Sequence, residues 1–294
     1  MTTPADKRSA RLSGGLVSRY GKLFLGSENG VVYALNEANG EVLWQTTVPG
    51  EVVASPAVED GRVVVLTTSG RLVALDTDEG KLQWTLSEEQ PPLTLRSAGA
   101  PIITNGAVIY GRADGKVGIA LLSNGQPVRQ SKVADPRGAT ELDRMVDVDA
   151  SPLIAGDELY AIAYNGQLMA RKLMSGDEVW KRKYSGYRDM AVTGNAIVLT
   201  DSRSHLFAVD RRNGLELWSN TQLENRTVTA PVILGDYVVV GDVEGYLYWL
   251  DRTDGTIKAM QQLDSSGLYA APLVEGDTLY VQSRDGKLYA LKRP

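Results

Sequence analysis

Cysteine is absent from this chain of 294 residues, and histidine occurs once, as His205. Without cysteine, a disulfide scaffold and a zinc site with cysteine ligands are both excluded. One histidine provides neither a second imidazole ligand nor a Cys–His pair for nucleophilic catalysis. The G-x-S-x-G and P-loop patterns are missing as well. The sequence therefore predicts no catalytic, cofactor-binding or metal-binding residue.

Long apolar runs and an excess of basic residues are also missing. No apolar stretch approaches the roughly 18 residues that a membrane-spanning helix needs. The net charge of −5 provides no electrostatic footprint for nucleic acid, so none is expected as a partner. The first residues, MTTPADKRSAR, carry charge but no apolar segment, so they do not resemble a secretory signal.

What the chain does contain is a repeated pattern of short strands. Residues 52–84 predict four of them, separated by turns rich in Gly, Ser and Asp. The predicted strands are Val52–Val58, Arg62–Thr67, Arg71–Leu75 and a fourth that starts at Lys81–Trp84. The first contains Pro56, which cannot donate a hydrogen bond to a neighbouring strand. Four such strands form one antiparallel sheet that cannot bury both of its faces alone.

The same pattern occurs seven times along the chain. A Gly or Ser precedes each third strand, at Gly30, Gly70, Gly115, Gly166, Ser204, Gly245 and Gly286. The intervals are 40, 45, 51, 38, 41 and 41 residues. Such a period, without any helical pattern, is typical of a β-propeller. Small residues near the ends of the third strands are expected to let neighbouring sheets approach; they are Ala34, Ala74, Ala120, Ala170, Ala208 and Ala290.

Four tryptophans follow the third strands at a fixed spacing. Each lies four residues after a glycine, and the four are Trp44, Trp84, Trp180 and Trp218. We expect the indoles to pack between neighbouring blades, because they are large apolar groups with one polar atom. The alternative, an aromatic ligand cage, is disfavoured because residues a full period apart do not converge on one pocket.

Two connections between blades are longer than the rest, Gln90–Ala98 and Ala134–Asp149. Equivalent connections lie on one face of a propeller, where long loops commonly carry function. The candidate partner-binding residues in these loops are Leu93, Leu95, Arg96, Asp147 and Asp149. We expect all five to be at least partly exposed, in one patch with an apolar centre and a charged rim. In the alternative, the leucines lie beneath their own loop and Arg96 pairs internally with Asp147 or Asp149.

The repeated phrase G-x-L-x-A-L-D…G-x-x-x-W resembles the tryptophan-docking repeat of quinoprotein (PQQ) dehydrogenases and their non-enzymatic relatives. Within that group, the chain is identified as a member of the BamB family of outer-membrane protein assembly factors. The segments that carry this resemblance are SENGVVYALNEANGEVLWQT (27–46), PPLTLRSAGAP (91–101), TELDRMVDVDASP (140–152), AYNGQLMA (163–170), VVVGDVEGYLYW (238–249) and LDSSG (263–267).

The resemblance implies an all-β fold, a β-propeller of PQQ-like four-stranded blades. The family has eight blades, whereas this chain supplies seven, of which the last lacks its outer strand. A polar stub at residues 1–10 precedes a single propeller domain at 11–294. Its expected blades cover about residues 11–50, 51–90, 91–145, 146–186, 187–225, 226–265 and 266–294. We therefore expect an N-terminally truncated member, without the family's signal peptide, lipidated cysteine, first blade and closing strand.

The resemblance also implies a function. Members are non-catalytic scaffold subunits of the outer-membrane β-barrel assembly machinery, at the periplasmic face of the outer membrane, which they contact through a lipid anchor. Leu93, Leu95, Arg96, Asp147 and Asp149 match the positions that bind the POTRA domains of BamA. Unfolded outer-membrane proteins are a further expected partner.

The alternative is a quinone- or metal-binding propeller enzyme. Alcohol-oxidising members of the superfamily use a vicinal cysteine pair, which this chain lacks. The clustered acids Glu141, Asp143, Asp147 and Asp149 come from one loop and do not have the order of a calcium-binding loop. No cofactor is therefore expected.

Overall fold

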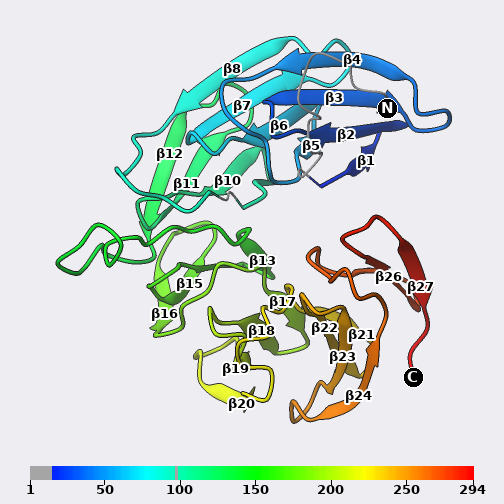
Figure 1. Ribbon diagram of the computed structural model, residues 1–294. Helices are drawn as coiled ribbons and strands as arrows, with labels where there is room; N and C mark the ends of the chain where they lie inside the picture. The colour runs from blue at the N-terminus through cyan, green and yellow to red at the C-terminus, as the bar shows by residue number, and fades with distance from the viewer. Residues whose placement is uncertain (1–14, 97–98) are drawn as a thin grey trace. The chain divides into compact units, whose positions relative to one another are not determined.

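The computed structural model describes residues 15–96 and 99–294, so the predicted stub at 1–10 lies outside the described residues. Every regular element in the described part of the chain is a β-strand, and consecutive strands form seven antiparallel sheets (Figure 1). Within this part no helix is long and apolar enough to cross a membrane. The chain divides into two compact units, Met1–Pro152 and Leu153–Pro294. Each unit is described by itself.

The first unit holds three four-stranded sheets. Its first sheet comprises β1 (Val17–Arg19), β2 (Lys22–Gly26), β3 (Val31–Asn36) and β4 (Val42–Thr47). Its second comprises β5 (Ala57–Glu59), β6 (Arg62–Leu66), β7 (Arg71–Asp76) and β8 (Leu82–Ser87). Its third comprises β9 (Ile102–Thr104), β10 (Ala107–Gly111), β11 (Lys116–Leu121) and β12 (Pro127–Lys132).

The second unit holds three four-stranded sheets and one of three strands. The first comprises β13 (Leu153–Ala155), β14 (Glu158–Ile162), β15 (Leu168–Lys172) and β16 (Glu178–Arg182). The next comprises β17 (Ala191–Thr193), β18 (Ala196–Thr200), β19 (Leu206–Asp210) and β20 (Glu216–Asn220). The third comprises β21 (Val232–Leu234), β22 (Tyr237–Gly241), β23 (Tyr246–Asp251) and β24 (Ile257–Gln262). The last comprises β25 (Leu273–Glu275), β26 (Thr278–Gln282) and β27 (Leu288–Leu291).

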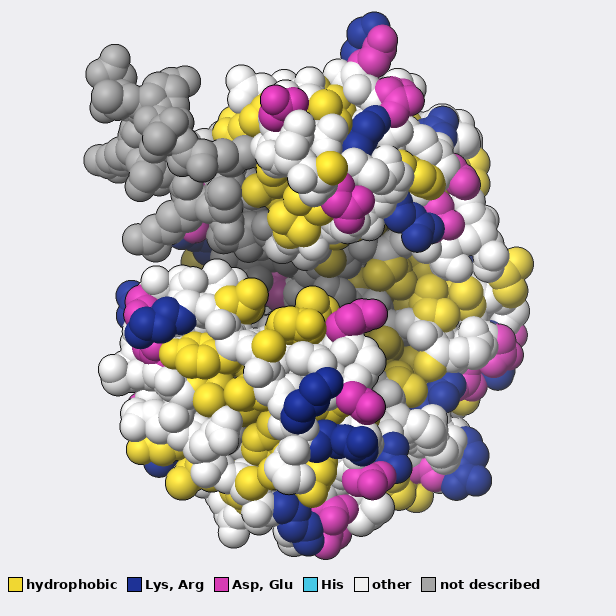
Figure 2. All heavy atoms as spheres, turned by 90° about the vertical axis from the view of Figure 1, so that its right-hand side faces the viewer, with side chains coloured by type: hydrophobic (Ala, Val, Ile, Leu, Met, Phe, Trp, Pro, Cys, Tyr) yellow, Lys and Arg dark blue, Asp and Glu magenta, His cyan; other side chains and the backbone are white. Residues whose placement is uncertain are grey.

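The predicted all-β class is confirmed, together with the seven blade sheets and the three strands of the last one. That residues 11–294 form a single domain stays a prediction. On the face shown in Figure 2, Lys and Arg side chains are interspersed with Asp and Glu, and no large area carries one sign of charge.

Each of the four tryptophans docks on the following sheet of its own unit. The indole Nε1 of Trp44, in β4, donates a hydrogen bond to the carbonyl of Thr77 at 3.0 Å. Its ring covers Gly80, where an added Cβ would lie 2.6 Å from the indole. The other indoles donate in the same way to the carbonyls of Leu122, Arg211 and Arg252. The predicted packing role of the tryptophans is therefore confirmed.

An alanine lies opposite each of these indoles in the neighbouring strand. The cross-strand pairs are Ala34–Trp44, Ala74–Trp84, Ala170–Trp180 and Ala208–Trp218. Each alanine is fully buried, and the register shifts by one residue directly after it. The small side chain leaves space for the indole, and the bulge turns the outer strand locally.

The predicted strand Val52–Val58 is wrong at its start, because β5 begins at Ala57, after Pro56. The Val52 amide instead donates to the Ser27 carbonyl of the preceding sheet at 3.0 Å. The Val52 side chain is fully buried against Gly26, where an added Cβ would overlap it. This segment therefore follows the neighbouring blade rather than its own sheet.

Candidate partner-binding site

The candidate residues lie on two connections of the first unit. Leu93, Leu95 and Arg96 belong to the segment between β8 and β9, and Asp147 and Asp149 belong to the segment that follows β12. Leu93 is 42% exposed, Leu95 is half-buried, and the Arg96 side chain is 67% exposed. The loop thus presents one apolar side chain and one guanidinium to solvent.

Two glutamates from the preceding blades hold Arg96. Its Nε and Nη2 donate to the two carboxylate oxygens of Glu51 at 2.9 and 2.8 Å, and Nη2 also reaches Glu28 at 3.3 Å. The hydrogen bond from Arg96 lowers the pKa of Glu51. A bidentate pair of this kind fixes the plane of the guanidinium as well as its position. Arg96 therefore pairs internally, with Glu51 and Glu28 instead of Asp147 or Asp149.

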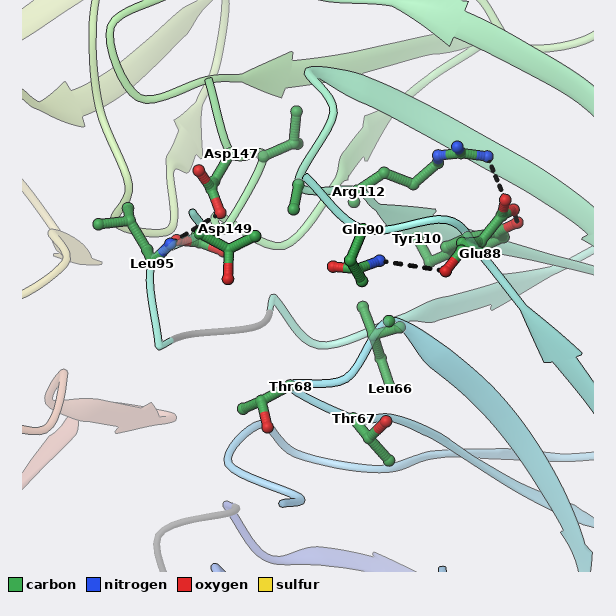
Figure 3. A pocket seen from close by; sticks show the side chains of 15 residues that line it. Leu66, Thr67, Thr68, Glu88, Gln90, Leu95, Tyr110, Arg112, Asp147 and Asp149 are labelled. Carbon is green, nitrogen blue, oxygen red and sulfur yellow. Dashed lines mark hydrogen bonds and ion pairs between the residues drawn. The ribbon is translucent and has the colours of Figure 1, made fainter. Parts of the chain in front are cut away.

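Asp147 and Asp149 are buried, so the prediction that all five candidates are exposed is wrong for these two. Asp147 is 1% exposed and Asp149 is 8% exposed. Oδ1 of Asp147 accepts a hydrogen bond from the Leu95 amide at 2.9 Å, as Figure 3 shows. Asp147 thus ties the Leu93–Arg96 segment down from beneath, and neither acid forms a charged rim.

Burial controls the ionisation of both acids. It raises the pKa of Asp147 to about 6, although the hydrogen bond from Leu95 opposes the change. Burial, together with repulsion from Asp147, raises the pKa of Asp149 to about 7. A carboxylate removed from water favours its neutral form unless a cation compensates it.

The acids are buried because the residue between them packs on the preceding sheet. The Val148 amide donates to the Arg112 carbonyl at 3.1 Å, and a Cβ on Gly111 would overlap the Val148 carbonyl. The contact repeats that of Val52 with Gly26 and that of Leu268 with Gly241. Its neighbours on either side, Asp147 and Asp149, are thereby drawn beneath the loop.

A buried ion network beside the acids was missed from the sequence. Arg112 directly follows β10, and its guanidinium donates to Glu88 and, at 3.0 and 2.8 Å, to Asp114. The Tyr110 hydroxyl also donates to Glu88, and burial raises the pKa of this tyrosine. A sequence signal does exist. Five of the six other repeats carry a turn-capping Ser, Thr or Asp three residues before the reference Gly or Ser, namely Ser27, Thr67, Asp201, Asp242 and Ser283. The sixth has Ala163, and Arg112 is the one charged base at this place.

A hollow that is open to solvent on one side lies between the loop and this network. Figure 3 shows Leu95, Asp147 and Asp149 on one side of it, with Arg112 and Glu88 on the other. In the described part of the chain, no group of three or more His, Cys, Asp or Glu converges to hold a metal ion.

The single histidine lies elsewhere, in the second unit. The Nδ1 atom of His205 lies 3.0 Å from Asp201, within the β18–β19 turn.

The family model described as "Outer membrane protein assembly factor BamB" matches residues 3–220 and 221–293. The chain belongs to the BamB family. The BamB of Shewanella oneidensis is 45% identical over 229 residues, which are 78% of this chain and 58% of that protein. The chain thus spans less than two thirds of this relative's length. The crystal structure of BamB from Moraxella catarrhalis superposes with a TM-score of 0.90 at 26% identity, over 96% of this chain and 85% of that one.

These matches confirm the family and the β-propeller class predicted from the sequence. A quinohemoprotein alcohol dehydrogenase from Pseudomonas putida HK5 also superposes, with a TM-score of 0.74 at 12% identity, over 93% of this chain and 63% of that one. Such a distant likeness shows the fold alone. Because the chain belongs to the BamB assembly factors, the prediction that it is not an enzyme is confirmed.

Proposed function

We propose that the chain is a non-catalytic scaffold for outer-membrane protein assembly, at the periplasmic face of the outer membrane. In this proposal it binds the POTRA domains of BamA and so helps to assemble unfolded outer-membrane proteins into the membrane. Membership of the BamB family supports this role.

The observation that carries the proposed binding face is the way its loop is held. Leu93 stands exposed beside a guanidinium that two glutamates fix, on a segment that Asp147 ties down. A surface that is already ordered loses less conformational entropy on binding. Leucine and arginine together offer apolar contact and directed hydrogen bonds, which suits the centre of an interface. Asp147 and Asp149 support this face from beneath.

The Arg96→Ala substitution tests the proposal. Central interface anchors cost roughly 2 kcal/mol or more when they are truncated, so we expect about thirtyfold weaker binding of purified POTRA domains. Thermal stability should change little, because an exposed ion pair contributes about 0–1 kcal/mol. Isothermal titration calorimetry measures the affinity, and thermal melts run in parallel report stability.

Arg212→Ala provides a matched control, since this exposed arginine is also held by a neighbouring carboxylate, Asp210, but belongs to the second unit. It should leave POTRA binding unchanged. Wild-type affinity in a folded Arg96→Ala protein would reject the proposed face.

A further inference from the structure

The hollow beneath the loop holds two carboxylates without sufficient partners. Oδ2 of Asp147 and Oδ2 of Asp149 are buried, and neither accepts a hydrogen bond from a described residue. Both side chains line the hollow. Burying a carboxylate without compensation is costly, and two neighbouring carboxylates repel each other as well. The pair therefore needs either protons or a cation.

The cations close to the hollow are already engaged. The guanidinium of Arg112 is shared between Glu88 and Asp114, and Lys116 donates to Asp114 at 2.7 Å. Arg96 is held by Glu51 and Glu28. The charged residues that line the hollow are Glu88, Arg112, Asp147 and Asp149, in which acids outnumber the cation. The surroundings thus favour a positive ligand and disfavour an anion.

The form of the site favours an organic cation over a metal ion. Calcium takes six to eight oxygen ligands, whereas Asp147 and Asp149 bring two carboxylates to one side of the hollow. Among the described residues, no group of three or more His, Cys, Asp or Glu could hold a metal ion. A single ammonium or guanidinium group needs only a few acceptors, and charge-assisted hydrogen bonds to carboxylates are strong. Thr94 and Leu95, from the loop that carries the proposed partner face, line this hollow.

We propose that this hollow receives one ammonium or guanidinium group of a basic side chain from the partner, bound by Asp147 and Asp149 with release of a proton. On binding, the Asp149 carboxyl loses its proton to solvent. The positive charge of the incoming cation then compensates the carboxylate in place of the proton. This inference rests on the proposed function for the identity of the partner. The expected affinity of the hollow for an organic cation depends only on the residues that line it.

The first experiment tests the hollow without the partner. The carboxyl carbons of Asp147 and Asp149 are titrated by NMR in methylammonium, methylguanidinium or potassium chloride at equal ionic strength. We expect the organic cations to lower the midpoint of Asp149 by about half a unit, a roughly threefold preference for the ionised form. The more effective cation distinguishes a lysine from an arginine. Equal midpoints in all three salts would overturn the proposal.

The second experiment measures affinity for the POTRA domains against pH. With a midpoint of about 7 for Asp149, ionisation between about pH 6 and pH 8 should tighten binding about tenfold. Asp149→Asn should make affinity nearly independent of pH. Asp143→Asn, in an exposed part of the same connection, should retain the wild-type dependence.

The two proposals fail in different ways. If the POTRA domains do not bind at any pH, the proposed function is wrong, and the NMR titration still decides the chemistry of the hollow. If they bind with the same affinity at both pH values, the proposed function stands and the cation site is rejected.

Discussion

Asp149 shows how one residue can differ from what its sequence position indicates. An aspartate in a propeller loop is expected to be exposed and charged, yet the side chain of Asp149 is only 8% exposed. Its environment depends on Val148, which packs against Gly111 of the preceding sheet. That contact joins residues nearly 40 positions apart, so no local pattern reports it. For the same reason, the pairing of Arg96 with Glu51 and Glu28 was not predicted.

The raised pKa of Asp149 makes the stability of the fold depend on pH. In the folded chain the pKa is about 7, compared with a reference value of 3.8, so the folded state binds the proton more tightly. The contribution of Asp149 to the free energy of unfolding is therefore largest at acid pH. This contribution declines as the pH rises from about 4 to about 7, and it stays low at higher pH.

Asp149→Asn should remove this dependence. At pH 8 we expect the variant to be more stable than the wild type by roughly 1–4 kcal/mol, from about 1.4 kcal/mol for each pKa unit. At about pH 4 the two proteins should have similar stability. Urea unfolding at both pH values measures the difference. A loss of stability at pH 8 would show that the Asp149 carboxylate is compensated in the folded state.

Asp143→Asn is the control for this experiment, because the hydroxyl of Thr140 lowers the pKa of Asp143. Its effect should have the opposite sign, with a loss of stability at pH 8. An increase at pH 8 in both variants would point to a general effect of removing negative charge.

The elements of this fold were predictable where their determinants are local. Third strands, turns and the glycine–tryptophan spacing all fall within about 25 residues of one another, and each is repeated along the chain. The strand order and the docking of the indoles followed from that repetition. The start of β5 did not, since Val52 bonds to Ser27 of another sheet. Among the candidate site residues, the exposed Leu93 and Arg96 were foreseen, whereas the support beneath them was not.

Tryptophan docking is one of the contacts that join neighbouring sheets within a unit. Trp218 is buried, and it covers Gly255, which has a φ of 71°. Replacing Trp218 by Ala should cost about 3–5 kcal/mol through the cavity left behind. Gly255→Ala should also destabilise, because its Cβ would overlap the indole and because positive φ is unfavourable for alanine. Chemical denaturation measures both changes.

Gly61→Ala separates these two effects. Gly61 has a φ of 72°, but an added Cβ would meet nothing within 4 Å. It should therefore lose only the roughly 1–2 kcal/mol of left-handed backbone strain. The additional loss in Gly255→Ala measures the docking contact. Equal losses in both glycine variants would mean that the indole moves aside without cost.

At the scale of the whole molecule, one strand differs from the other outermost strands. Among the described residues β27 pairs with β26 alone, so it leaves one edge unpaired, as the fourth strands of the other sheets do; the difference lies in its side chains. Its sequence, LYAL, contains no charged or amide side chain, and Leu288 is 70% exposed. By contrast, β24 carries Lys258 and two glutamines, and β16 carries Lys181 and Arg182. Charged side chains on edge strands disfavour pairing with other molecules.

We therefore expect copies of this chain to associate through β27 as their concentration rises. Leu288→Lys should shift the population towards the monomer, because lysine at an exposed edge opposes strand pairing. Met174→Lys is the matched control. It adds the same charge at a residue that is 77% exposed but lies in the turn between β15 and β16. Sedimentation velocity over a range of concentrations measures the association. If both variants associate like the wild type, contacts through β27 are excluded; if only Leu288→Lys becomes monomeric, the unpaired edge is their cause.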